Sequence, residues 1–133
     1  MFNMKLLKAY MAGVALPVII CPFIFMTLIS MGKLNIVEHM PIYFVPLLWG
    51  VWNMFSVGMG DHCPIKDINT RYLIHGAVLG VILSILGLFV FNVDMALFGM
   101  GGSFGYYLII GAAIIYALVW RYIVLYFNKT LGL

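Results

Sequence analysis

The chain has 133 residues, of which 65% are hydrophobic and 8% are charged, and its mean hydropathy is +1.14. Soluble domains carry about 25% charged residues, and a soluble core of this size could not hide so much apolar surface. The composition therefore excludes an ordinary soluble domain and predicts one integral membrane domain, residues 1–133, with four crossings. The net charge of +3 comes from Lys and Arg scattered along the chain, so nucleic acid is not an expected partner.

Residues 6–31 are the first predicted membrane span. Lys5 lies just before this apolar run and Lys8 lies near its start. The run is longer than the hydrophobic core of a signal peptide, so we expect an uncleaved helix. Pro17 and Pro22 each remove a backbone donor within this run and predict a kink. The small or weakly polar face of this helix, which should point inward, consists of Gly13, Pro17, Cys21, Ile24 and Thr27.

Residues 41–59 are the second predicted span, with Pro41 in the first turn, where proline is tolerated. This helix, like the first, is expected to be kinked. The most polar transmembrane face of the chain lies here and consists of Pro46, Trp49, Asn53, Ser56 and Gly60. A buried Asn53 amide needs partners, and an interhelical hydrogen bond of this kind contributes about 0.6–2 kcal/mol. We expect this face to point into the bundle near Cys21 and Thr27, either lining a solute path or joining helices.

The connection over residues 60–71 and the start of the next span offer the only candidate metal ligands. These are Asp61, His62, Cys63 and His75. Their spacing matches no common zinc motif, and no other span carries a histidine that could face His75 across a haem. We therefore expect no metal and no other cofactor. The two cysteines should be free thiols, because Cys21 and Cys63 are predicted at different depths.

Residues 72–91 are the third predicted span, twenty residues that carry no formal charge while His75 is neutral. At 1.5 Å per residue they form about 30 Å of helix, the thickness of the hydrocarbon core. Gly76, Gly80, Ser84 and Gly87 fall within an arc of roughly 80°. This small-residue groove, with its GxxxG pattern, predicts close packing by another helix.

Residues 92–105 are too apolar for an ordinary solvated loop, so they should lie in the interface or re-enter the protein. The fourth predicted span, 106–127, contains Arg121. This residue either reaches phosphate headgroups as an interfacial anchor or faces the interior, where it binds an anionic substrate headgroup or pairs with Asp61 or Asp67. Two interfacial aromatic belts are expected, one with Tyr106 and Tyr107 and the other with Trp120, Tyr122 and Tyr126.

Six of the seven basic residues fall on one side of a four-span topology, the side shared by the two termini and residues 60–71. Lys33 alone falls on the other side. Positive residues favour the cytoplasmic side, so we expect an antiparallel bundle with both termini inside, in a bacterial inner membrane.

No predicted span contains Asp or Glu, which argues against proton coupling through an intramembrane acid. No span combines a nucleophile, a histidine and an acid, so an enzyme is not expected. A membrane enzyme that acts on lipid would need a dependence on His75 or on the cluster at residues 61–63. Two main hypotheses remain. The first is an oligomeric transport or permeation protein for a small or amphipathic solute. The second is a non-catalytic accessory or assembly subunit of a larger membrane complex. Both make the lipid bilayer a partner, together with further copies of the chain or other membrane proteins.

Overall fold

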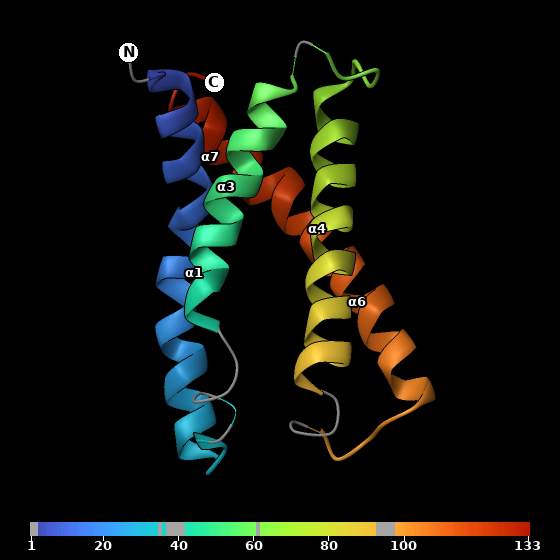
Figure 1. The fold of residues 1–133 in the computed structure, drawn as a ribbon. Coiled ribbons are helices and arrows are strands. Elements are labelled where there is room, and N and C mark those ends of the chain that lie inside the picture. Colours follow the sequence, from blue (N-terminus) through green and yellow to red (C-terminus); the bar gives the residue numbers. More distant parts are fainter. Residues whose placement is uncertain (1–2, 35, 37–41, 61, 93–97) are drawn as a thin grey trace.

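The structure, a computed structural model, describes residues 3–34, 36, 42–60, 62–92 and 98–133. Every regular element in these ranges is a helix (Figure 1). Three helices are long and apolar enough to cross a membrane, and they cover Met4–Ser30, Ile68–Phe91 and Ser103–Thr130. The predicted all-helical class is confirmed, and three such helices are consistent with a multi-pass membrane protein.

Helix α1, Met4–Ser30, corresponds to the first predicted span and has 27 residues, or about 40 Å. Its N-terminus is capped by Asn3, whose side-chain oxygen accepts a hydrogen bond from the Lys5 backbone N–H at 3.1 Å. Pro17 and Pro22 lie inside the helix, which continues past both of them. The kink expected at these prolines stays a prediction.

Helix α3, Val45–Gly58, follows a short 3-10 turn, η1, over Ile42–Phe44. Its 14 residues span about 21 Å, less than the roughly 30 Å of hydrocarbon in a bilayer. The second predicted span, over residues 41–59, is therefore not confirmed as a membrane crossing. Pro46 lies in the first turn of α3, where its missing N–H breaks no helical hydrogen bond, so a kink in this helix is not confirmed either. Pro41 lies outside the described residues.

Helix α4, Ile68–Phe91, begins four residues before the predicted third span. Asp67 caps its N-terminus by accepting the Thr70 N–H at 2.8 Å. Asn92 ends the helix with φ 47°, a left-handed conformation that asparagine adopts more readily than most residues, and its N–H donates to the Gly87 carbonyl.

Helix α6, Ser103–Val119, continues through a π-helical segment, η2 (Trp120–Val124), into α7 (Leu125–Thr130). The π segment is marked by the Leu125 N–H, which donates to the carbonyl of Trp120, five residues earlier. Part of the predicted re-entrant segment 92–105, residues 93–97, lies outside the described residues, so that prediction is untested.

The helices form two pairs joined by the C-terminal helix (Figure 1). α1 packs along α3, α4 packs along α6, and α3 makes few direct contacts with α4. The helix α6–η2–α7 runs obliquely from the far end of α4 to a position beside α1 (Figure 1). Both termini and the connection from α3 to α4 lie at one end of the molecule. A closed antiparallel four-helix bundle is not confirmed.

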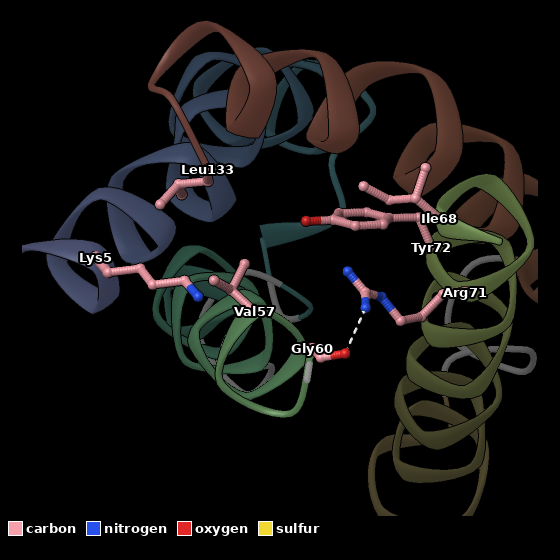
Figure 2. A pocket seen from close by; sticks show the side chains of 7 residues that line it. All are labelled: Lys5, Val57, Gly60, Ile68, Arg71, Tyr72 and Leu133. Carbon is pink, nitrogen blue, oxygen red and sulfur yellow. Dashed lines mark hydrogen bonds between the residues drawn. The ribbon is translucent and has the colours of Figure 1, made fainter. Parts of the chain in front are cut away.

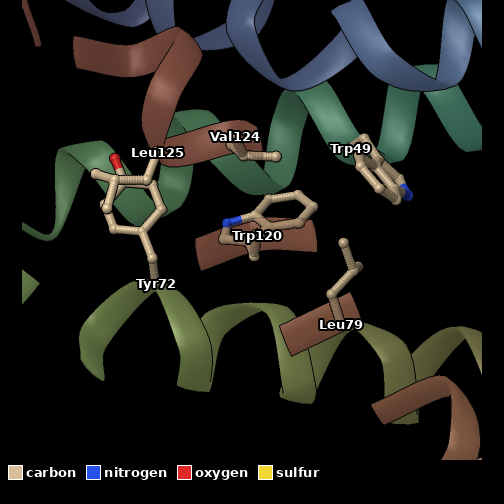
Figure 3. Packing of buried hydrophobic residues seen from close by; sticks show 6 residues of the cluster. All are labelled: Trp49, Tyr72, Leu79, Trp120, Val124 and Leu125. Carbon is tan, nitrogen blue, oxygen red and sulfur yellow. The ribbon is translucent and has the colours of Figure 1, made fainter. Parts of the chain in front are cut away.

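The hydrophobic core lies where the oblique helix crosses the others (Figure 3). Its buried members are Trp49, Tyr72, Leu79, Trp120, Val124 and Leu125. Trp120 is fully buried in this cluster, so it packs inside the protein. Its place at the level of an interfacial belt stays a prediction. Trp120 packs against Gly76 of α4, where an added Cβ would lie 2.5 Å from the Trp120 Cβ. The four tyrosines of the predicted belts are exposed.

Candidate functional site

Two asparagines from distant parts of the chain bond to each other inside the protein. Asn53 Nδ2 donates to Asn128 Oδ1 at 3.0 Å, and Asn128 Nδ2 donates to Asn53 Oδ1, also at 3.0 Å. Asn53 Nδ2 further donates to the Ala9 carbonyl at 2.6 Å. Both asparagine side chains are 0% exposed. Each side-chain amide therefore provides hydrogen-bond partners for the other, and an amide buried without partners would cost free energy.

Tyr72 extends this pair to a further helix. Asn128 Nδ2 donates to the Tyr72 hydroxyl at 2.7 Å, and the tyrosine is buried. Ala9 comes from α1, Asn53 from α3, Tyr72 from α4 and Asn128 from α7. We call these four residues the amide network. It connects the two helix pairs at the point where α7 reaches α1.

Aromatic side chains pack beside the amide network. The rings of Trp49 and Trp120 lie 4.9 Å apart, and Trp49 meets Tyr116 edge to face at 5.2 Å. Ser56, one helical turn after Asn53, is fully buried. Its hydroxyl and the Trp120 indole N–H have no hydrogen-bond partner within the described part of the chain.

Glycines allow both helix pairs to approach closely. A Cβ on Gly13 of α1 would lie 2.6 Å from the Trp49 carbonyl of α3, and one on Gly50 would lie 2.5 Å from the Tyr10 ring. In the other pair, a Cβ on Gly80 of α4 would lie 2.7 Å from the Ala112 carbonyl of α6. Each pair therefore packs backbone against backbone at these positions.

The predicted groove on α4 is used in part. Gly76, like Gly80, is buried against α6, where an added Cβ would collide with the Tyr116 carbonyl. Ser84 is half-buried, and its hydroxyl donates to the Gly80 carbonyl of its own helix at 2.6 Å. Gly87 is half-buried near the end of the helix. Sequence reasoning missed Gly50, although Gly13 was expected on an inward face.

The structure brings some of the predicted interior polar residues together. Trp49, Asn53 and Ser56 are buried on one side of α3, and Cys21 is buried on α1. Thr27 is exposed, and its hydroxyl donates to the Phe23 carbonyl of the preceding turn at 2.8 Å. Asn128, the principal partner of Asn53, was not singled out from the sequence.

A pocket of about 110 Å³ opens next to the amide network (Figure 2). Its lining residues are Lys5, Val57, Gly60, Ile68, Arg71, Tyr72 and Leu133. The Arg71 guanidinium donates through Nη1 to the Gly60 carbonyl at 2.9 Å. Lys5 and Arg71 approach the pocket from opposite sides, and the Tyr72 hydroxyl points into it (Figure 2).

The remaining charged candidates lie apart from this pocket. Arg121 is half-buried, with its guanidinium carbon 5.3 Å from the centre of the Tyr122 ring. Asp67 is exposed, and its pKa is lowered because the Thr70 hydroxyl and backbone N–H donate to the carboxylate. The positive charge of Arg121 contributes a smaller lowering of the same pKa. Asp61, the other acid considered as a partner for Arg121, lies outside the described residues.

The candidate metal ligands are dispersed. His62 is exposed and Cys63 is half-buried. His75 packs against the ring of Trp52, at 6.1 Å, and its carbonyl accepts the Trp52 indole N–H at 3.0 Å. Among the described residues no three His, Cys, Asp or Glu side chains gather in a way that could hold a metal ion. Cys21 and Cys63 are free thiols.

The fold and the site together define a class of protein and no narrower group. It is an all-helical protein with three helices suited to crossing a membrane, joined internally by a buried amide network. The chain matches no family model, no curated protein and no solved structure.

Proposed function

We propose that this protein is a non-catalytic accessory or assembly subunit of a larger membrane complex. The observation that carries the proposal is the state of Asn53. The amide of this residue is 0% exposed and is bonded to Asn128 and to the Ala9 carbonyl. A polar face that served as a solute path would need groups available to water or solute, whereas these groups are used to join helices.

The surface of the chain supports the same proposal. In the most apolar 18-residue window of each long helix, only between 17 and 28% of the residues are buried within the chain. Most of the apolar side chains, including Phe23 of α1 and Phe89 of α4, are therefore left for lipid or for the helices of a partner. The short helix α3 is also apolar, with Val51 and Phe55 exposed. We propose that partner helices cover part of this surface.

The competing hypothesis is a homo-oligomeric transport or permeation protein, in which copies of the chain enclose a path. It predicts a defined homo-oligomer and a flux that depends on Asn53. The accessory-subunit proposal predicts a complex with another membrane protein in fixed ratio. It also predicts that Asn53→Leu affects stability without a separate effect on transport.

The test is to extract the tagged chain from its native membrane with a gentle detergent and to determine the mass and composition of the complex. A partner in constant ratio, retained through a second purification by a tag on that partner, supports the proposal. The proposal would be overturned by a homo-oligomer that contains no other protein and gives solute flux in proteoliposomes, if Asn53→Leu abolishes that flux while the protein stays folded. Ser56→Ala serves as the matched control, because it alters the same face without breaking the amide network.

A further inference from the structure

The pocket beside the amide network combines two cations that the proposed function does not use. Lys5 lies in the first turn of α1, and Arg71 lies in the first turn of α4. The two side chains belong to different helix pairs and reach the pocket from opposite sides (Figure 2). None of the seven described lining residues is Asp or Glu.

Arg71 retains hydrogen-bonding capacity that the protein does not use. One N–H of its guanidinium is bonded to the Gly60 carbonyl. Its Nε is buried and has no hydrogen-bond partner among the described residues. A buried, unpaired donor of a charged group is costly, and a planar guanidinium is suited to bidentate contact with an oxyanion. The terminal nitrogen of the guanidinium that is not bonded to Gly60 points into the pocket (Figure 2), where an anion can accept its hydrogen bonds.

The other lining groups fit such an anion. The Tyr72 hydroxyl accepts a hydrogen bond from Asn128 and points into the pocket, where its own proton can be donated. A cavity of about 110 Å³ has room for several waters at about 30 Å³ each, and so for a group of four oxygens around one phosphorus. The N-termini of α1 and α4 both lie at this end of the molecule and add partial positive charge.

We propose that the pocket between Lys5 and Arg71 binds a phosphate-type oxyanion, supplied either by the headgroup of an anionic lipid or by a free anion. The depth of the pocket is suited to a headgroup, because both cations lie in the first turns of long apolar helices. Since Tyr72 also holds Asn128, the bound anion stabilises the amide network and with it the junction of the two helix pairs.

The test uses the purified full chain in a neutral detergent, with the thermal unfolding midpoint and bound lipid by native mass spectrometry as readouts. One arm adds inorganic phosphate against sodium chloride of equal ionic strength. The other adds phosphatidylglycerol against phosphatidylcholine. A saturable rise of the midpoint in the phosphate arm identifies a free anion as ligand. A rise with phosphatidylglycerol alone, with retained lipid, identifies the headgroup.

Three variants locate the effect. Arg71→Gln should weaken binding by about tenfold or more, because a charge-assisted hydrogen bond is lost. Lys5→Gln should weaken it by about threefold, since this exposed ammonium contributes a weaker contact, and it leaves the Arg71 bond to Gly60 intact. Lys66→Gln, the control, removes an exposed charge outside the pocket and should change affinity less than about twofold.

Two results would overturn the proposal. One is the absence of any saturable response in both arms. The other is an equal loss of affinity in Lys5→Gln and Lys66→Gln, because the response would then reflect overall charge and not this pocket. If Arg71→Gln fails to fold, Lys5→Gln still decides between these outcomes, because its side chain is exposed and its replacement leaves the amide network unchanged.

Discussion

Asn53 and Asn128 are separated by 75 positions in the sequence, yet each donates to the side-chain oxygen of the other at 3.0 Å. Their pairing joins α7 to α3. Asn53 also bonds to the Ala9 carbonyl of α1, and Asn128 bonds to the Tyr72 hydroxyl of α4. In an apolar environment the alternative to such a pair is two unsatisfied amides, which costs free energy. The pair thus joins a short C-terminal helix to both helix pairs, which also meet through the Trp52–His75 hydrogen bond and the Trp49–Tyr116 ring contact.

Removal of the Tyr72 hydroxyl should weaken this junction. We expect Tyr72→Phe to lower the free energy of unfolding by about 1 kcal/mol, because Asn128 loses a partner while the ring keeps its packing. Tyr126→Phe, at an exposed ring on α7, should stay within about 0.5 kcal/mol of the parent. Reversible unfolding in mixed detergent micelles provides the measurement. Equal effects of the two changes would contradict a role for the hydroxyl.

The close contact of α4 with α6 predicts opposite effects of the same substitution at two glycines. Gly80→Ala should destabilise the protein by about 1–3 kcal/mol, because the new methyl group meets the Ala112 carbonyl. Gly111→Ala on α6 should be neutral or stabilise by up to about 1 kcal/mol, since nothing lies near the added carbon and alanine favours helix. Unfolding free energies of both variants test this prediction. Stabilisation by Gly80→Ala would show that the helices do not meet there.

Asp67 predicts a dependence of stability on pH. The pKa of its carboxyl is lower in the folded protein than in the unfolded chain, so its contribution is present above the unfolded value, about 3.9, and is lost as pH falls through the folded value. Asp67→Asn keeps a capping side chain without the charge. The unfolding midpoint of the parent should exceed that of the variant at pH 7, and this difference should shrink below about pH 4. A difference that grows on acidification would contradict the assignment.

Both termini and the α3–α4 connection lie at the same end of the molecule. This arrangement predicts which positions can be labelled from the same face of the membrane. In a Cys63→Ser background, Lys66→Cys and Thr130→Cys should react with an impermeant thiol reagent only from the cytoplasmic face. Met31→Cys, an exposed position at the other end of α1, should react only from the opposite face. Reaction of Lys66→Cys and Thr130→Cys from different faces would contradict both the fold and the predicted orientation.

The sequence was informative about features that depend only on the length of an apolar segment. It located the three long helices, and it identified Asn53 as a group in need of partners. It did not identify Asn128, because the predicted fourth span ended at Phe127 and the asparagine fell into a polar tail. In the structure the helix continues to Thr130, so Asn128 lies within α7. Trp120, Val124 and Asn128, four positions apart, lie on one side of this continued helix, and all three are buried.

Contacts between helices distant in the sequence were also beyond sequence reasoning. Small residues at Gly76 and Gly80 indicated a surface for helix packing without indicating which helix would use it. Gly50 stands alone among large apolar residues, and its contact with the Tyr10 ring depends on how α1 crosses α3. Periodicity reveals the faces of single helices. The pairing of these faces is set by packing of the whole chain.

A double-mutant cycle on Asn53 and Asn128 tests the central claim most directly. Each single change, Asn53→Leu or Asn128→Leu, leaves one buried amide without its partner and should lower the free energy of unfolding by about 1–3 kcal/mol. In the double variant neither amide remains, so the loss should be smaller than the sum of the two single losses by about 1 kcal/mol or more. Losses that add within about 0.3 kcal/mol would mean that the two side chains do not interact, and would contradict the account of this pair as the joint between the helix pairs.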